Sequence, residues 1–441
     1  MLERSCVVFH GMSLAVCLAA LCAAGPAVAQ PEEGFDRFFE AGTLRIDYHH
    51  FGNNKEETLA IDAVLREGDW PGPRNGLTAF PDFGKYRAVV LDQASGKPIF
   101  EYGYSSLFGE WQTTPEATLT RRVFHETVRL PMPRAPVILR ILSRDNRGRL
   151  VKVFEETVDP HTHLVGATPG QRKDVTTLLL ADAGPIDSTL DVVILADGYP
   201  AHQQEKAARD LARFARVMIE TPPFDRYKDR LSIRGVIPVA DLCGPDEPRK
   251  SLHRNPPLRT TFNTFDSARY LTTSDNRTLR DLASLVPYDA IVVVVNTSRY
   301  GGAGIFNMFS IFISDNEYDE YVMMHEFGHG FGGLGDEYYT SSVAYSDFYP
   351  RGVEPWEPNV TALLHGPSKV KWGSQIEPGV PVPTPPVPEY SARTGVFEGA
   401  GYSAKGLYRP ALDCKMFSKK EIDYCAVCAR AVEQMIRYYT E

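Results

Sequence analysis

The sequence predicts an α+β protein, in which an antiparallel β-sandwich is followed by a second domain of alternating strands and helices. Between residues 30 and 165, short β-rich runs follow one another with turn residues and without helical patterns between them. Across residues 166–441, buried-strand runs alternate with amphipathic helical segments, which is typical of parallel α/β units. Residues 1–29 have the composition of a targeting segment and lie outside the predicted fold.

This first segment is typical of a secretory signal peptide. Arg4 gives a basic start, residues 7–24 are rich in Leu, Ala, Val and Cys, and Ala27-Val28-Ala29 matches an A-x-A cleavage signal. A retained membrane anchor is the alternative, but the small residues and Gly25-Pro26 favour removal. We therefore expect cleavage after Ala29, a secreted or periplasmic protein, and no membrane span after cleavage.

The predicted sandwich, residues 30–165, serves as an accessory domain. Its strands have the two-residue period of half-buried strands and are expected over residues 44–48, 58–64, 86–91, 117–130 and 137–142. A turn at residues 145–148 predicts a hairpin whose return strand covers residues 151–157. His49 and His50 are adjacent, so on a strand they point to opposite faces and cannot bind one ion together. We expect two half-exposed histidines instead.

The second domain begins with a strand–helix–strand unit. Strands are expected over residues 190–196, 231–239 and 288–296, and helices over residues 203–220, 278–285 and 421–439. The glycine-marked run at 300–304 leads into a further strand-like segment at 305–314. A glycine-containing edge strand can pair with an extended peptide, although an ordinary bulge or turn explains the same glycines.

Charge and cysteine content narrow the class of protein. The formal net charge is −9 and the pI about 5.7, so the chain lacks the basic footprint of a nucleic-acid-binding protein. Four cysteines lie beyond the signal peptide, and an even number in an exported chain predicts disulfides. We favour a bridge from Cys414 to Cys425 or Cys428. The Cys-x-x-Cys of Cys425 and Cys428 is also compatible with a redox pair or with half of a structural zinc site.

The most informative motif is His325-Glu326-Phe327-Gly328-His329, an H-E-x-x-H pattern. Residues four apart share one face of a helix, with Cβ atoms about 5–6 Å apart, so both imidazoles can bind one ion. Zinc takes such ligands and lowers the pKa of its bound water to about 7, and Glu326 can then accept a proton from that water. The apolar run at 321–324 predicts a core helix, and the glycines that follow the motif predict its abrupt end. A surface helix that carries two histidines by chance is the alternative.

Together with this motif, several other stretches resemble the IgA-peptidase family of zinc metallopeptidases, which is metzincin-like. They are Asn296-Thr297-Ser298-Arg299-Tyr300-Gly301-Gly302-Ala303-Gly304, Gly333-Leu334-Gly335-Asp336-Glu337-Tyr338-Tyr339 and Asp413-Cys414-Lys415-Met416-Phe417. The last is flanked by similar residues at 397–402 and 424–428. The resemblance covers residues 185–441 and implies a metzincin-like α/β zinc peptidase domain over 166–441. It also implies a β-rich N-terminal domain.

Metzincins place a third metal ligand after a glycine turn and a methionine turn beneath the metal. The usual H-E-x-x-H-x-x-G-x-x-H pattern would have a histidine where this chain has Gly335. With Gly333 as the turn glycine, one residue is inserted and Asp336 falls in the ligand position. An aspartate is an acceptable zinc ligand, and Glu337 is the competing candidate. By the same resemblance, Met416 is the methionine of the turn.

The segment 348–410 is rich in Pro, Gly and Tyr, which is typical of long loops that wall a cleft. Within it, Tyr402 and Tyr408 are candidates to stabilise a tetrahedral oxyanion, with a packing role as the alternative for each.

These observations predict an exported zinc-dependent endopeptidase that hydrolyses peptide bonds of protein substrates. One Zn²⁺ per chain would be held by His325, His329 and Asp336, and Glu326 would activate the zinc-bound water. The protein or peptide substrate would lie extended along the edge strand. The alternative is an exported binding or adhesion protein with a structural zinc site. The intact Glu326 argues against it, because a structural site has no use for a base.

Overall fold

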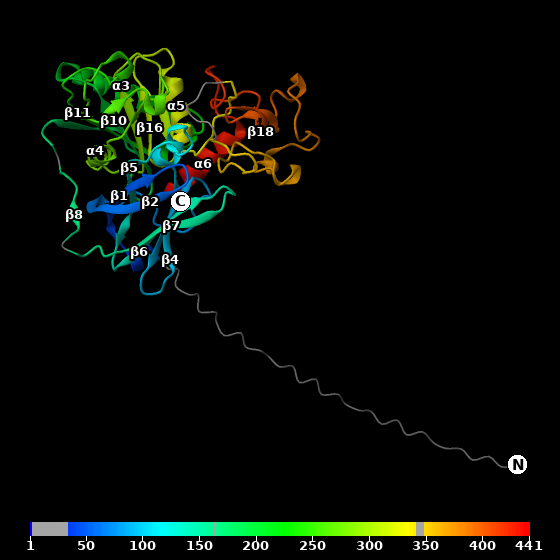
Figure 1. Ribbon diagram of the computed structural model, residues 1–441, viewed down its shortest axis with the longest axis horizontal. Helices are drawn as coiled ribbons and strands as arrows, with labels where there is room; N and C mark the ends of the chain where they lie inside the picture. Colours follow the sequence, from blue (N-terminus) through cyan, green and yellow to red (C-terminus); the bar gives the residue numbers. More distant parts are fainter. Residues whose placement is uncertain (2–33, 163, 171, 341–347) are drawn as a thin grey trace. The chain divides into compact units, whose positions relative to one another are not determined.

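The N-terminal strands form two four-stranded sheets that are antiparallel apart from the short strand β8. The computed structural model describes Met1 and residues 34–162, 164–170, 172–340 and 348–441, so the predicted signal peptide lies outside the described residues apart from Met1. One sheet has the order β5-β1-β2-β8 and the other the order β4-β3-β6-β7 (Figure 1). The strands are β1 (Phe39–Gly52), β2 (Glu57–Asp69), β3 (Tyr86–Asp92), β4 (Pro98–Tyr104), β5 (Arg122–Pro133), β6 (Val137–Arg144), β7 (Leu150–Val158) and β8 (Gly166–Ala167).

Both sheets contribute side chains to one hydrophobic cluster. Ile46 of β1 and Val128 of β5 belong to it, and so do Val90 of β3 and Ile141 of β6. Burial along β6 alternates residue by residue, as the two-residue period of a half-buried strand requires. β6 and β7 pair antiparallel around the turn predicted at 145–148, so this hairpin is confirmed.

The histidine pair of β1 differs from the expectation. His49 is half-exposed, but the His50 side chain is only 1 % exposed. Its two ring nitrogens lie 2.9 Å from Glu126 and 3.1 Å from Glu57, and two carboxylates can stabilise a buried imidazolium. The strand period correctly separated the two rings, but the carboxylates that hold His50 come from other strands.

A six-stranded sheet forms the core of the rest of the chain. Its order is β15-β16-β14-β10-β11-β9, with a parallel centre and an antiparallel strand at each edge. The central strands are buried along most of their length, as near-continuous apolar runs require. The strands are β9 (Val175–Ala181), β10 (Leu190–Asp197), β11 (Leu231–Pro238), β14 (Ala290–Val295), β15 (Ala303–Ile305) and β16 (Phe309–Ile313).

Four helices of eight residues or more accompany this sheet in the described part of the chain. They are α3 (Gln204–Glu220), α4 (Asn276–Ala283), α5 (Asp319–Gly330) and α6 (Ala426–Thr440). The shorter elements are α1 (Phe35–Phe38), α2 (Leu107–Trp111), β12 (Thr260–Thr261), β13 (Thr272–Thr273), β17 (Phe397–Ala400) and β18 (Ser403–Arg409). The prediction of α3 is confirmed almost to the residue, because its buried face repeats every three to four positions through Ala207, Leu211, Phe214 and Met218.

The chain is thus a mixed α+β protein with more strands than helices. Across the residues that the structure describes, no helix combines the length and the apolar character needed to cross a membrane.

Candidate metal centre

Helix α5 carries the H-E-x-x-H motif and is fixed at its start and along its buried face. Arg213 of α3 forms an ion pair with Asp319 at 2.7 Å, in the first turn of α5. Val322, Met323 and Phe327 are buried in the core that α5 shares with the six-stranded sheet. His325 and His329 therefore project from a helix that cannot easily rotate.

Edge strand β15 lies unusually close to this helix. A Cβ atom on Gly304 would lie 2.2 Å from the carbonyl oxygen of Glu326 and 2.6 Å from the Cβ of His329. A Cβ atom on Gly302 would lie 2.7 Å from Oε1 of Glu326. Glycine at these two positions is what allows the strand to run directly beside the motif.

The end of α5 turns the chain back toward the two histidines. Gly333 has φ +63°, and its N–H donates to the carbonyl of His329 at 3.2 Å, the pattern of a left-handed helix cap. Leu334 N–H donates to Gly328 O at 3.1 Å. Asp336 follows two residues later and is brought into contact with both imidazoles.

Three ligand atoms converge at this point. Nε2 of His325 and Nε2 of His329 are 3.3 Å apart, and Oδ1 of Asp336 lies 3.1 Å from the first and 3.3 Å from the second. Ligands about 2.0–2.1 Å from a tetrahedral zinc ion lie about 3.3 Å from one another. The spacing therefore fits a single ion bound by all three residues.

The hydrogen bonds around the histidines also favour a cation. Nδ1 of His325 lies 3.0 Å from the carbonyl of Lys415, and Nδ1 of His329 lies 2.6 Å from the carbonyl of Leu334. A carbonyl only accepts, so each Nδ1 carries the hydrogen, and a neutral ring turns the lone pair of Nε2 toward the centre. Oδ1 of Asp336 is buried and has no hydrogen-bond donor. Three acceptors that face one another repel unless a positive charge lies between them.

Electrostatics lead to the same conclusion. Burial lowers the pKa of His329, but the charge and hydrogen bond of Asp336, the charge of Glu326 and the carbonyl of Leu334 together raise it to about 9. Burial raises the pKa of Asp336, but the two imidazoles hold it well below its usual range. The cluster stabilises added positive charge, which a proton or a metal ion can supply, and its ligand set suits zinc.

The side chains of Asp336 and Glu337, although adjacent in sequence, lie in different surroundings. Asp336 faces the histidines, whereas the Glu337 side chain is fully buried among Asn359 and Cys428, with Oε1 3.0 Å and 3.1 Å from their donors. Of the two carboxylates that the sequence left open, the structure brings only Asp336 to His325 and His329.

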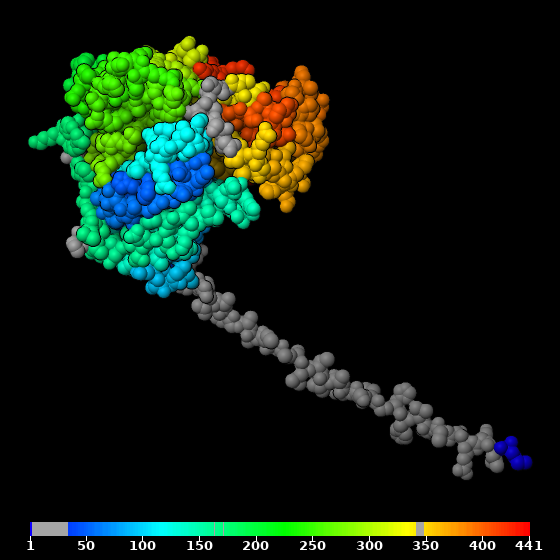
Figure 2. Space-filling model, in the orientation of Figure 1, coloured from blue at the N-terminus to red at the C-terminus, as the bar shows by residue number. Residues whose placement is uncertain are grey.

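Glu326 lies beside these ligands at the wall of a cleft of about 1140 Å³. Burial raises the pKa of Glu326, and His325 and His329 oppose this increase. The cleft is lined by β15, by α2 and by the loops at 348–357. Figure 2 shows the cyan surface around α2 and the yellow surface near residue 350 on the same face of the molecule.

Met416 lies directly against the motif. It is fully buried, and a Cβ atom on Gly328 would lie 2.8 Å from its Sδ. Its carbonyl accepts a hydrogen bond from Glu337 N–H at 2.9 Å, and the preceding carbonyl of Lys415 is the partner of His325. The segment around Met416 therefore supports both α5 and the segment that carries Asp336.

The two candidate tyrosines have different positions. Tyr402 donates from Oη to Oδ2 of Asp336 at 2.5 Å and lines the cleft, so it is placed to orient this carboxylate. Tyr408 packs on a separate cluster that contains Val370 and Trp372 and is not among the residues of the described chain that line the cleft. This position favours a packing role for Tyr408.

Sequence reasoning missed two further residues at the centre. Tyr338 stacks on His325 with ring centroids 6.2 Å apart. Arg269 lines the cleft, and its guanidinium lies 5.9 Å from the ring centroid of Tyr338. Tyr338 adjoins the carboxylate pair in sequence and could have been found there. Arg269 belongs to a segment without a motif, so only folding brings it here.

Cys414, Cys425 and Cys428 are all unbonded, as is Cys243, so none of the cysteines that the structure describes forms a disulfide. The predicted bridge from Cys414 to Cys425 or Cys428 is therefore not present in the structure. Three thiols rather than two meet at one point, and the carboxylate of Glu337 joins them.

Comparisons with known proteins agree with this geometry. A family model described as IgA Peptidase M64 matches residues 178–391 and 386–436. A second, described as Peptidase M64 N-terminus, matches residues 34–155. No curated protein matches the chain significantly. Because the two family models together span most of the sequence, the chain belongs to the IgA peptidase M64 family and is a peptidase.

Proposed function

We propose that this peptidase is an exported, zinc-dependent endopeptidase with a metzincin-like catalytic domain. The observation that carries the proposal is the convergence of His325, His329 and Asp336, whose ligand atoms lie 3.1–3.3 Å apart. Glu326 lies beside them, on the same helix and at the wall of the cleft. A purely structural metal site would have no need of an open cleft or of a carboxylate next to the ligands.

In this proposal the three ligands would hold one zinc ion, which would supply Lewis acidity to the scissile carbonyl and to the attacking water. Glu326 accepts a proton from that water and later delivers it to the leaving amine. Tyr402 holds Asp336 in its orientation through the hydrogen bond to Oδ2.

The substrate would be an extended peptide lying along β15. This strand is at the edge of the six-stranded sheet, and Gly302, Ala303 and Gly304 all line the cleft. Pairing with an edge strand would hold the peptide backbone at a fixed distance from Glu326, whatever its side chains are. Arg269 lines the same cleft, and its positive charge would attract an oxygen of the substrate.

Two further elements complete the proposal. The N-terminal sheets, which share one hydrophobic cluster, form a sandwich-like accessory domain over 30–165. Export rests on residues 1–29, whose basic start, apolar stretch and A-x-A signal are those of a signal peptide cleaved after Ala29.

The test is the variant Glu326→Gln, which keeps the shape of the side chain and removes its basicity. We expect zinc content to be unchanged and cleavage of unfolded casein and of a mixed peptide library to fall by roughly 10²–10⁴-fold. Glu320→Gln is the matched control, because Glu320 is on the same helix but its side chain is 56 % exposed. Immunoglobulin A, named in the family description, serves as a further substrate in the same assay.

Full cleavage by the Glu326→Gln variant would contradict its assignment as the base. A wild-type protein that binds zinc but cleaves none of these substrates would instead favour the binding or adhesion protein considered from the sequence. Measuring zinc content beside activity therefore separates the two readings.

A further inference from the structure

A second group of metal-ligating side chains lies on the other side of the Asp336-Glu337 segment. It consists of Glu337, Cys414, Cys425 and Cys428, whose ligand atoms all lie within 4.8 Å of one another. Three thiolates at zinc–sulfur distances of about 2.3 Å would lie about 3.8 Å from one another, and a carboxylate oxygen slightly closer, so a small movement would close the group on one ion. Cys414, Cys428 and Glu337 are fully buried.

The carboxylate in this group is incompletely satisfied. Oε1 of Glu337 accepts from Asn359 at 3.0 Å and from Cys428 at 3.1 Å. Oε2 of Glu337 is buried and has no hydrogen-bond partner. A buried carboxylate oxygen left unpaired is costly, and a metal ion bound to this oxygen would remove that cost.

Paired disulfides do not explain this arrangement. A disulfide uses two thiols with sulfur atoms about 2.05 Å apart and would leave the third cysteine and Glu337 unaccounted for. The fourth described cysteine, Cys243, is exposed and contacts Asn296 and Gln203 instead. The group therefore has three thiols and one carboxylate, the ligand count of a closed tetrahedral site.

Several features of the surroundings would help to hold ionised sulfur atoms, against the burial that raises the pKa of Cys414 and of Cys428. Cys425 is the N-cap residue of α6 and Cys428 lies in its first turn, where the helix dipole stabilises negative charge. The backbone N–H of Cys425 lies 3.2 Å from Sγ of Cys414 and donates to it. The buried guanidinium of Arg409 attracts the Glu337 carboxylate and offsets part of the negative charge.

We propose that Glu337, Cys414, Cys425 and Cys428 bind a second, structural zinc ion. Each thiol releases its proton to solvent as its sulfur binds the ion, and all four positions are filled by the protein, so no place remains for substrate. This site is independent of the proposed peptidase chemistry, because it shares no ligand with the first centre.

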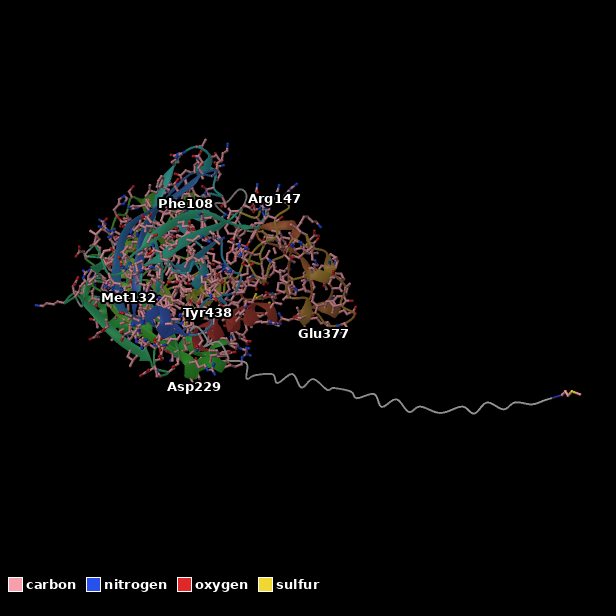
Figure 3. The ribbon with its side chains drawn as sticks, turned by 90° about the horizontal axis from the view of Figure 1, so that it is seen from below. Phe108, Met132, Arg147, Asp229, Glu377 and Tyr438 are labelled. Atoms are coloured by element: carbon pink, nitrogen blue, oxygen red, sulfur yellow. The ribbon has the colours of Figure 1, made fainter. Side chains whose placement is uncertain are left out.

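The second ion would hold in place the chain segments that support the centre of His325, His329 and Asp336. Glu337 directly follows Asp336, and Cys414 is two residues before Met416, which contacts α5 at Gly328. The remaining two ligands come from the start of α6. In Figure 3 this red helix runs from the orange loop region toward Tyr438, near the C-terminus. One ion would therefore join the segment after α5, the methionine turn and the last helix.

Metal analysis of the protein purified without chelators tests the proposal. We expect two zinc ions per chain in the wild type, one in Cys428→Ser and one in Glu337→Gln. Cys243→Ser is the matched control and keeps two, because that cysteine is outside the group. His329→Ala also falls to one, but by loss of the other ion, so the double variant His329→Ala/Cys428→Ser retains none.

Cobalt substitution of the wild type keeps the test decisive if the cysteine variants fold poorly. Cobalt bound to three thiolates gives an intense sulfur-to-metal charge-transfer band in the near ultraviolet, whereas the histidine–aspartate centre gives none. We expect this band in the wild type and in His329→Ala. A wild type with one zinc ion, no such band, and a disulfide detected among Cys414, Cys425 and Cys428 would overturn the proposal.

Discussion

Removing the hydroxyl of Tyr402 tests whether this residue positions the metal ligand or stabilises the transition state. The variant Tyr402→Phe keeps the ring, which packs against Tyr338 with centroids 5.5 Å apart. The hydrogen bond from Oη to Oδ2 of Asp336 is lost. A hydrogen bond to a charged group contributes roughly 1.5–3 kcal/mol.

At about 1.4 kcal/mol per factor of ten, this loss corresponds to a roughly 10- to 100-fold weaker affinity for the ion at Asp336. The assay is recovery of peptidase activity as free zinc is titrated from a chelator buffer, which reports the affinity of the catalytic site alone. Tyr408→Phe is the matched control, since Tyr408 does not line the cleft. Its zinc dependence should equal that of the wild type.

The outcome distinguishes the two roles of Tyr402. If Tyr402 positions Asp336, kcat of Tyr402→Phe at saturating zinc stays within a few-fold of the wild type. An oxyanion donor would instead leave zinc affinity unchanged and lower kcat by roughly 10²–10³-fold. That second pattern would refute the positioning role.

Two further predictions concern packing and pH. Gly304→Ala should inactivate the enzyme and destabilise it by roughly 1–3 kcal/mol, because its Cβ would lie 2.2 Å from a backbone oxygen of α5. In Gly68→Ala the new Cβ meets nothing within 4 Å, so denaturant titration should show little change. Burial lowers the pKa of His50, but Glu126 and Glu57 raise it to about 9, above its ordinary value of 6.5. The folded state therefore holds this proton more tightly, and up to roughly 3 kcal/mol of stability present below pH 6.5 is lost as the pH rises through 9. His50→Gln should flatten that part of the stability profile, and an unchanged slope would contradict the assignment.

Local sequence patterns predict much of the fold. Apolar periodicity located α3 and the central strands β10, β11 and β14, because each pattern depends only on which face of the element is buried. Helix α6 begins at Ala426 rather than at 421. Cys425 has extended backbone angles there, and its side chain lies with Glu337, Cys414 and Cys428.

The metal centre likewise has one part that the sequence predicts and another that only folding brings together. The spacing of His325, Glu326 and His329 is a helical spacing, so the sequence by itself determined that two imidazoles and a carboxylate share one end of a helix. The family resemblance followed from the same local motifs.

Only the tertiary structure shows which of Asp336 and Glu337 faces the two histidines. Neighbouring residues of a non-helical segment can project to opposite sides, and the sequence does not say which side faces the histidines. The left-handed turn at Gly333 and the hydrogen bond from Glu337 N–H to Met416 O fix that choice. Tyr402 donates a hydrogen bond to Asp336, and Cys428 donates one to Glu337. Each donor lies more than sixty residues further along the chain than its acceptor. Long-range packing, which no local pattern encodes, therefore gives the two adjacent acids their separate surroundings.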